Sequence, residues 1–210
     1  MDDAGAMLGW PFQDGRWPVR LGLMGLLWLT LTLTVIGIPV AAIALTGWML
    51  TAADNLRGGR AELPAPGLYL RRGAALFLVQ LAYLAALVVL AGLPLAAGLW
   101  LGGIGGGLLA VFAQSLFTLG TTALVAATPA LAHLTESDGA LRALQPGRLL
   151  ALLGRNRRLS VGTGLMSLLC LDIISPIGLL AFGIGLAVTA TYAYAVLAST
   201  IVAFGRQVRR

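Results

Sequence analysis

Hydrophobic residues gather in three long stretches of this chain, and short arginine-bearing segments separate them. The stretches run from Val19 to Ala53, from Gly73 to Ala132 and from Leu159 to Gly205. A bilayer's hydrocarbon core is about 30 Å thick, so a helix rising about 1.5 Å per residue needs roughly 20 residues to cross it. Each stretch exceeds one crossing and contains glycine or proline breakers. The pattern therefore predicts an all-α fold with six transmembrane helices arranged as three hairpins.

The breakers set the predicted helix boundaries. The first stretch is expected to turn at residues 37–39, because proline suits the first turn of a new helix. The second is expected to turn within residues 102–107, where five glycines in six residues disfavour a helix, and Pro94 to kink or end the helix before it. The third is expected to turn around residues 172–178. The predicted spans are residues 19–36, 39–55, 73–99, 106–131, 159–174 and 178–204, within a single membrane domain of residues 1–210.

Between the second and third stretches, leucines recur at helical spacing and alternate with arginines. Thr135 and Asp138 fit a capping box, and Pro146 favours two short helices over one. We expect an amphipathic helix over residues 138–153, lying at the cytoplasmic membrane surface. It either packs under the bundle or recognises anionic lipid or a partner. The candidate contacts are Arg142, Arg148, Arg155, Arg157 and Arg158.

Composition agrees with a lipid environment. Of 210 residues, 59% are hydrophobic and 10% charged, with a mean hydropathy of +0.91, which excludes an ordinary water-soluble domain. The net charge of +6 raises the possibility of nucleic acid, but no basic stripe, stacking aromatics or zinc spacing accompanies it. Anionic lipid headgroups are the expected counterions. With Cys170 the single cysteine, an intramolecular disulfide is excluded.

The arginines predict the orientation. All fourteen basic residues are arginines, and they fall in four short patches. Cytoplasmic loops of membrane proteins are enriched in Lys and Arg, most strongly in short loops beside the spans. If each stretch is a hairpin, all patches share the cytoplasmic side, and so do both termini. The patches are Arg16 and Arg20; Arg57, Arg60, Arg71 and Arg72; Arg142, Arg148, Arg155, Arg157 and Arg158; and Arg206, Arg209 and Arg210.

Several local patterns resemble one known family. They are "PFQDGRWPVRLGLMGLL", "GWMLTAADNLRGGRAELP", "TPALAHLTESDGALRAL" and an aromatic-rich last helix that ends in arginines. Together they resemble the domain-of-unknown-function 4013 family of bacterial and archaeal multi-pass membrane proteins. Trp17, the Leu63 and Pro64 pair, and Gly73 match positions of its pattern, whereas Ala65 and Pro66 depart from it. The resemblance implies this membrane architecture and the cytoplasmic (inner) membrane of a prokaryote, and it implies no activity.

Residues that could carry chemistry are few. His133 is the only histidine, and no nucleophile signature such as G-x-S-x-G accompanies it. Asp172 is the candidate intramembrane polar site, because an ionisable residue inside a membrane is costly; a turn at the outer surface is its other interpretation. No catalytic or metal-binding residue is assigned, no cofactor is expected, and residues that would bind one are unknown. Only a cluster containing His133, Asp172 or Glu136 beside a substrate-sized pocket would indicate an enzyme.

These observations predict a non-catalytic integral membrane protein, an accessory or stabilising subunit of a larger membrane assembly. Its expected partners are membrane lipids and other integral membrane proteins, and not nucleic acid. The alternative is a small-solute or lipid transporter, in which glycine and proline breaks and scattered threonines line a cavity. A continuous polar cavity reaching the membrane midplane would favour the transporter. A packed bundle with an exposed apolar flank would favour the accessory subunit.

Overall fold

The computed structural model describes residues 4–178 and 184–208, and the regular structure in these ranges is entirely helical. Among the described residues, five helical segments are long and apolar enough to cross a membrane: Gly37–Arg57, Leu70–Leu101, Gly103–Ala126, Arg157–Ile177 and Gly185–Val208. The all-α prediction is therefore confirmed. The elements are α1 (Ala4–Gly9), the 3-10 turn η1 (Trp10–Gln13), α2 (Trp17–Thr32), α3 (Gly37–Arg57), α4 (Leu70–Leu101), α5 (Gly103–Ala126), α6 (Thr128–Ser137), α7 (Ala140–Ala143), α8 (Pro146–Arg155), α9 (Arg157–Leu168), the π-helical segment η2 (Leu169–Ile174), α10 (Ser175–Ile177) and α11 (Ile184–Val208).

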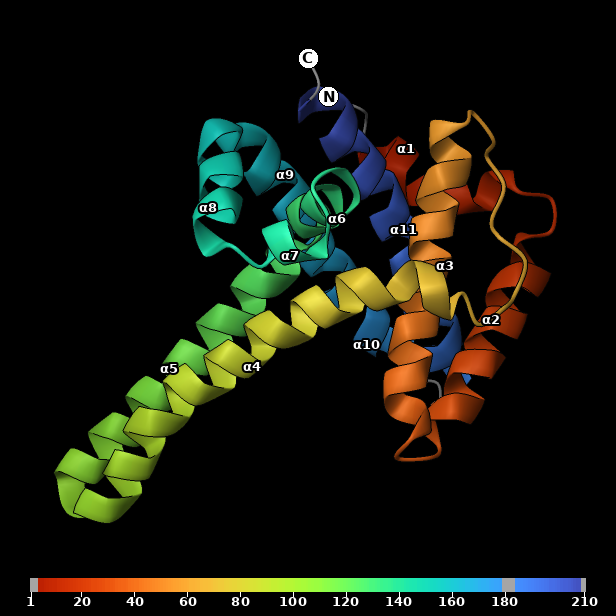
Figure 1. Ribbon diagram of the computed structural model, residues 1–210. Helices are drawn as coiled ribbons and strands as arrows, with labels where there is room; N and C mark the ends of the chain where they lie inside the picture. The colour runs from red at the N-terminus through yellow and green to blue at the C-terminus, as the bar shows by residue number, and fades with distance from the viewer. Residues whose placement is uncertain (1–3, 179–183, 209–210) are drawn as a thin grey trace.

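The core lies where α3 and α11 pack together with α2 (Figure 1). In α3, 61% of the spanning stretch is buried, and in α11 67% is buried. Trp48, Leu197 and Phe204 are among the fully buried side chains. The N-terminal segment covers one side of α11. There the Trp10 indole donates to the Ala195 carbonyl at 3.0 Å, and the Tyr192 hydroxyl donates to the Leu8 carbonyl at 2.8 Å.

The α4–α5 hairpin projects obliquely away from this bundle (Figure 1). Only 17% of the spanning stretch of α4 and 6% of that of α5 is buried, so most of their apolar surface faces outward. The two helices approach closely at small residues: a methyl group on Gly98 would lie 2.7 Å from the Gly106 carbonyl oxygen. An exposed apolar arm of this kind needs lipid or another protein around it.

The glycine run turns more tightly than predicted. Only Gly102 and Gly103 have positive φ, at 62° and 58°, and α5 begins at Gly103. The prediction of a turn through residues 102–107 is thus wrong beyond its first two positions. Two glycines suffice to reverse the chain, and Gly106 serves the close approach to α4 instead. Pro94, predicted to kink or end the regular helix, does not end it, because α4 continues to Leu101 with Pro94 inside.

Two other boundaries differ from the prediction. The first hairpin turns at residues 33–36 instead of 37–39, and the Gly37 N–H donates to the Thr34 hydroxyl at 3.0 Å as α3 begins. With 16 residues, α2 is shorter than the five spanning segments. The predicted turn at residues 172–178 is wrong up to Ile177, because the chain stays helical through the π-helical segment η2 and through α10. Pro176 lies in the first turn of α10, where proline is tolerated. The start predicted for the sixth span falls partly on residues 179–183, outside the described residues.

The amphipathic segment predicted over residues 138–153 contains two short helices, α7 and α8, and Pro146 starts the second, as its position predicts. Leu149 is buried, while Leu152 and Leu153 are half-buried against the core. The capping-box prediction is wrong. Thr135 lies inside α6 and donates to the Leu131 carbonyl at 2.7 Å, so its hydroxyl is not at a helix start.

Candidate functional site

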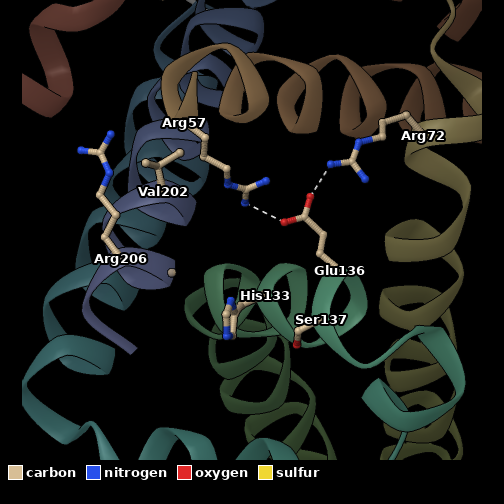
Figure 2. Close-up of a pocket in the computed structure, with 8 residues that line it drawn as sticks. Arg57, Arg72, His133, Glu136, Ser137, Val202 and Arg206 are labelled. Atoms are coloured by element: carbon tan, nitrogen blue, oxygen red, sulfur yellow. Dashed lines mark hydrogen bonds and ion pairs between the residues drawn. The ribbon is translucent and has the colours of Figure 1, made fainter. Parts of the chain in front are cut away.

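Charged side chains from three helices meet at one end of the bundle. Arg57 ends α3, Arg72 lies in the first turn of α4, and Glu136 lies near the end of α6. Glu136 Oε2 is 2.6 Å from Arg57 Nη2, and its other oxygen binds Arg72. Figure 2 shows the carboxylate between the two guanidinium groups. Asp54 completes the ring, at 2.9 Å from both Arg57 Nη1 and Arg72 Nη2. We refer to these four residues as the ion-pair cluster.

Local structure explains how the cluster assembles. Asp54 and Arg57 are three residues apart and so share a face of α3. Arg72 reaches them because α4 starts against α3: a methyl group on Gly73 would lie 2.6 Å from the Gly47 nitrogen. Tyr69, just before α4, has a φ of 28°, which is unusual for a residue other than glycine. Glu136 arrives from α6, which follows α5. The cluster therefore ties both ends of the α4–α5 hairpin to α3.

A cleft of about 430 Å³ opens beside the cluster. Its lining residues lie in the last two turns of α3, α6 and α11 or in the first turn of α4. Arg206 donates to the Leu56 carbonyl at 3.4 Å, and the His133 ring meets Phe204 edge-on with centroids 6.0 Å apart. Both Glu136 oxygens accept hydrogen bonds from guanidinium groups. The carboxylate therefore links α6 to α3 and α4. The lining residues are Arg57, Arg72, His133, Glu136, Ser137, Val202, Gly205 and Arg206 (Figure 2).

A second group of polar contacts holds the linker between α3 and α4 in place. Asp14 is only 5% exposed, and its carboxylate accepts hydrogen bonds from the Arg16 N–H at 2.9 Å, the Arg20 guanidinium at 2.9 Å and the Leu63 N–H at 3.0 Å. Arg20 also donates to the Leu63 carbonyl. The neighbouring Pro64 carbonyl accepts from the Trp48 indole at 3.2 Å. Leu63 and Pro64, two of the residues that carry the family resemblance, are thus points where the linker docks.

Tyr69 is the last residue of the linker before α4. Its hydroxyl donates to the Ala65 carbonyl at 2.8 Å. Burial raises the pKa of the Tyr69 phenol above its ordinary value, and the positive charge of Arg20 offsets part of that rise. The phenol therefore remains a protonated donor at neutral pH.

The five arginines predicted as interfacial contacts lie apart from the cleft. All are exposed: Arg142 is on α7, Arg148 and Arg155 are on α8, and Arg157 and Arg158 begin α9. Arg148 pairs with Asp138 at 3.3 Å, and the other four make no ion pair with any described residue. Their role as lipid or partner contacts stays a prediction.

Asp172, the candidate intramembrane polar site, is exposed on the π-helical segment η2. Its side chain makes no hydrogen bond or ion pair within the described ranges, and it does not line the cleft. Of the three residues considered for chemistry, the structure therefore brings together His133 and Glu136 and leaves Asp172 elsewhere. Within residues 4–178 and 184–208, no three His, Cys, Asp or Glu side chains are grouped to hold a metal ion.

Sequence reasoning misses the partners of Glu136. Arg57 and Arg72 are 79 and 64 residues away from it along the chain. Periodicity relates only neighbouring turns of one helix, so it carries no information on such pairs. Asp14 is missed for the same reason, because its contact with Leu63 spans 49 residues.

Comparison of this chain with protein-family models, curated proteins and solved structures found no match.

Proposed function

We propose that this protein is an integral membrane protein of the cytoplasmic (inner) membrane of a prokaryote, with six crossings arranged as three hairpins and both termini in the cytoplasm. The arginine-bearing ends of the helices support this topology, because Arg20, Arg57 and Arg72 all make contacts at the same end of the bundle. The α2 helix rises about 24 Å. Its crossing is completed by the turn at residues 33–36, which is uncharged and whose large apolar side chains are exposed.

In this topology α7 and α8 lie at the cytoplasmic interface. Leu149 faces the core, whereas Arg148 and Arg155 are exposed, as an interfacial amphipathic helix requires. Membership of the domain-of-unknown-function 4013 family is part of the same proposal. The buried side chains of Leu63 and Pro64 and the close approach of backbone at Gly73 support it, because burial and close approach restrict which residues fit at these positions.

We further propose that the protein is a non-catalytic accessory or stabilising subunit, and that the α4–α5 hairpin docks a transmembrane helix of another protein. The observation that supports this function is an exposed polar face on α5. Gln114 lies near the middle of this 24-residue helix, and Ser115 and Thr118 are exposed beside it. Gln114 donates only a long hydrogen bond, of 3.4 Å, to the Thr118 hydroxyl, and its carbonyl oxygen accepts none from the described residues.

An amide with unmet hydrogen bonds is costly in hydrocarbon, where no water can replace the missing partner. A second helix would supply those bonds. A second helix can approach α4 and α5 closely here, because Gln114 lines a groove of about 340 Å³ whose lining includes the small residues Ala91, Gly92, Ala110 and Ala113. Small residues that allow backbones to approach, beside one hydrogen-bonding side chain, are typical of packed membrane helices.

A transporter is less well supported by the same geometry. Its polar cavity would have to run along the helices to the midplane, whereas the residues that line the cleft at the ion-pair cluster all lie near helix ends. An enzyme would need a free acid or base beside its substrate. The cleft does bring His133 and Glu136 together, but the Glu136 carboxylate is held by two arginines and the His133 ring packs against Phe204.

Gentle detergent extraction followed by mass spectrometry of co-purifying proteins tests the accessory role. The wild-type chain should extract with a stoichiometric membrane partner. Gln114→Leu should reduce the recovered partner about fivefold, because one interhelical hydrogen bond contributes about 1 kcal/mol.

Gln80→Leu is the matched control. Gln80 donates to Thr128 at 3.3 Å inside the molecule, so its loss should leave the partner bound. Recovery of the wild-type chain alone as a monomer would overturn the proposal, and so would equal partner recovery with Gln114→Leu and wild type.

A further inference from the structure

An apolar groove of about 580 Å³ runs between α5, α8 and α9. Its lining positions on α9 are residues 157, 160, 161, 164, 165 and 168, which follow one face of the helix from its first turn to its last. Leu150 of α8 and Val161 and Leu165 of α9 line the groove and are more than half exposed. A groove of this size and lining matches the dimensions and chemistry of hydrocarbon ligands.

One end of the groove is basic. Arg157, the first residue of α9, lines the groove and makes no ion pair with any described residue. The N-cap residue Asn156 makes no capping hydrogen bond through its side chain, so the first N–H groups of α9 have no side-chain acceptor. A helix N-terminus with open N–H donors beside a guanidinium group is suited to a phosphate.

We propose that this groove binds one anionic phospholipid, with an acyl chain along α9 and the phosphate at Arg157. Charge complementarity selects the anionic headgroup. The segment from Arg142 to Arg158 contains five arginines and no acidic residue, and Asp138, just before it in the sequence, is paired with Arg148. A choline headgroup would bring its own cation toward this unpaired positive charge, whereas a glycerol headgroup would not.

A neighbouring groove provides an internal comparison. It has a volume of about 280 Å³ and lies on another face of α9, between that helix, α1 and α11. Arg158 and Gly162 line it, so adjacent arginines serve different grooves. The larger groove is the one suited to an acyl chain, because it has a volume of about 580 Å³ and its lining follows α9 from the first turn to the last.

Native mass spectrometry of the full chain, titrated with dioleoyl phosphatidylglycerol or dioleoyl phosphatidylcholine, tests this assignment. We expect one phosphatidylglycerol to bind more tightly than phosphatidylcholine. Arg157→Gln should weaken phosphatidylglycerol binding about fivefold, as expected for one basic residue near a lipid headgroup. Arg60→Gln removes another exposed arginine, which lies on the linker before α4 and makes no ion pair with a described residue, and should change the affinity less than about twofold.

A second pair of variants tests the groove itself. Gly154→Leu places a side chain at a lining position where no atom lies within 4 Å of the added Cβ, and it should weaken binding of the acyl chain. Gly162→Leu fills the neighbouring groove from an equally open position and should leave the affinity unchanged. Inorganic phosphate alone should not compete at the concentrations at which the lipid binds.

Three results would overturn the proposal: equal affinity for the two lipids, equal losses in Arg157→Gln and Arg60→Gln, or competition by inorganic phosphate as strong as that by the lipid. The two arginine variants change exposed side chains only, so this comparison decides the matter even if Gly154→Leu fails to fold.

Discussion

At the scale of single residues, the polar contacts with the most consequence are those that cross between segments. Asp14 has three donors from two segments and almost no exposure to solvent, so each donor depends on this carboxylate. Removing one partner of a buried charged pair leaves the other unsatisfied, which costs more than the pair itself contributes. Stability should therefore respond more strongly at Asp14 than at the exposed acids.

We predict that Asp14→Asn lowers the free energy of unfolding by about 2–4 kcal/mol. The amide retains the shape but loses the charge that satisfies Arg20, and its NH₂ group cannot accept from the Leu63 N–H. Thermal unfolding in detergent, followed by tryptophan fluorescence, measures the change. Glu62→Gln is the control, because Glu62 is 65% exposed and lies 3.7 Å from the same arginine. Equal shifts in the two variants would contradict a special role for the buried carboxylate.

At the scale of elements, the position of the α4–α5 hairpin depends on how closely α4 approaches α3. Gly47 and Gly73 meet backbone to backbone at this crossing, and the ion-pair cluster forms just beyond it. The exposed pairs of the cluster contribute about 1 kcal/mol or less each. The crossing is therefore the main determinant of where the hairpin starts, and the cluster aligns its two ends.

We predict that Gly73→Ala destabilises the protein by about 1–3 kcal/mol, because the added methyl group would overlap backbone atoms of α3. Gly92→Ala is the control within α4. No atom lies within 4 Å of its added Cβ, and alanine is the better helix former, so this variant should be neutral or more stable. Thermal unfolding of the two variants, measured in the same detergent, makes the comparison. A Gly73→Ala protein as stable as wild type would show that the helices can separate without cost.

At the scale of the whole molecule, Arg57 and Arg72 meet in the ion-pair cluster. The exposed apolar hairpin extends from the bundle (Figure 1). The proposed topology places residue 65 on the cytoplasmic side and residues 35 and 104 on the outer side. Positive charge near the spans opposes the reverse orientation.

Single cysteines at positions 35, 65 and 104, in a chain with Cys170→Ala, test this topology. A membrane-impermeant maleimide should label position 65 only in inside-out vesicles, and positions 35 and 104 only in right-side-out vesicles. Labelling of 65 and 104 from the same side would refute the hairpin that α4 and α5 form. Labelling of 35 from the cytoplasmic side alone would mean that the short α2 does not complete its crossing.

Much of the fold could be predicted because it depends on local properties of the chain. Apolar length and the arginine patches predict long helices, and Pro146 predicts two helices before α9. The predicted boundaries at residues 102–107 and 172–178 are wrong because glycine and proline disfavour a helix without forbidding one. Packing against Gly98 keeps Gly106 helical, and a π-helical segment carries the chain on to Pro176.

By itself, the sequence determined that this chain is helical and suited to lipid, because burial of apolar side chains and the cost of charge in hydrocarbon act on every residue wherever it lies. Only the tertiary structure decided that Glu136 joins Arg57 to Arg72, that Asp14 holds the linker, and that Gln114 faces outward. Those outcomes depend on which helices touch and at what angle. Contacts between distant segments arise from packing complementarity, which no periodic pattern within one segment records.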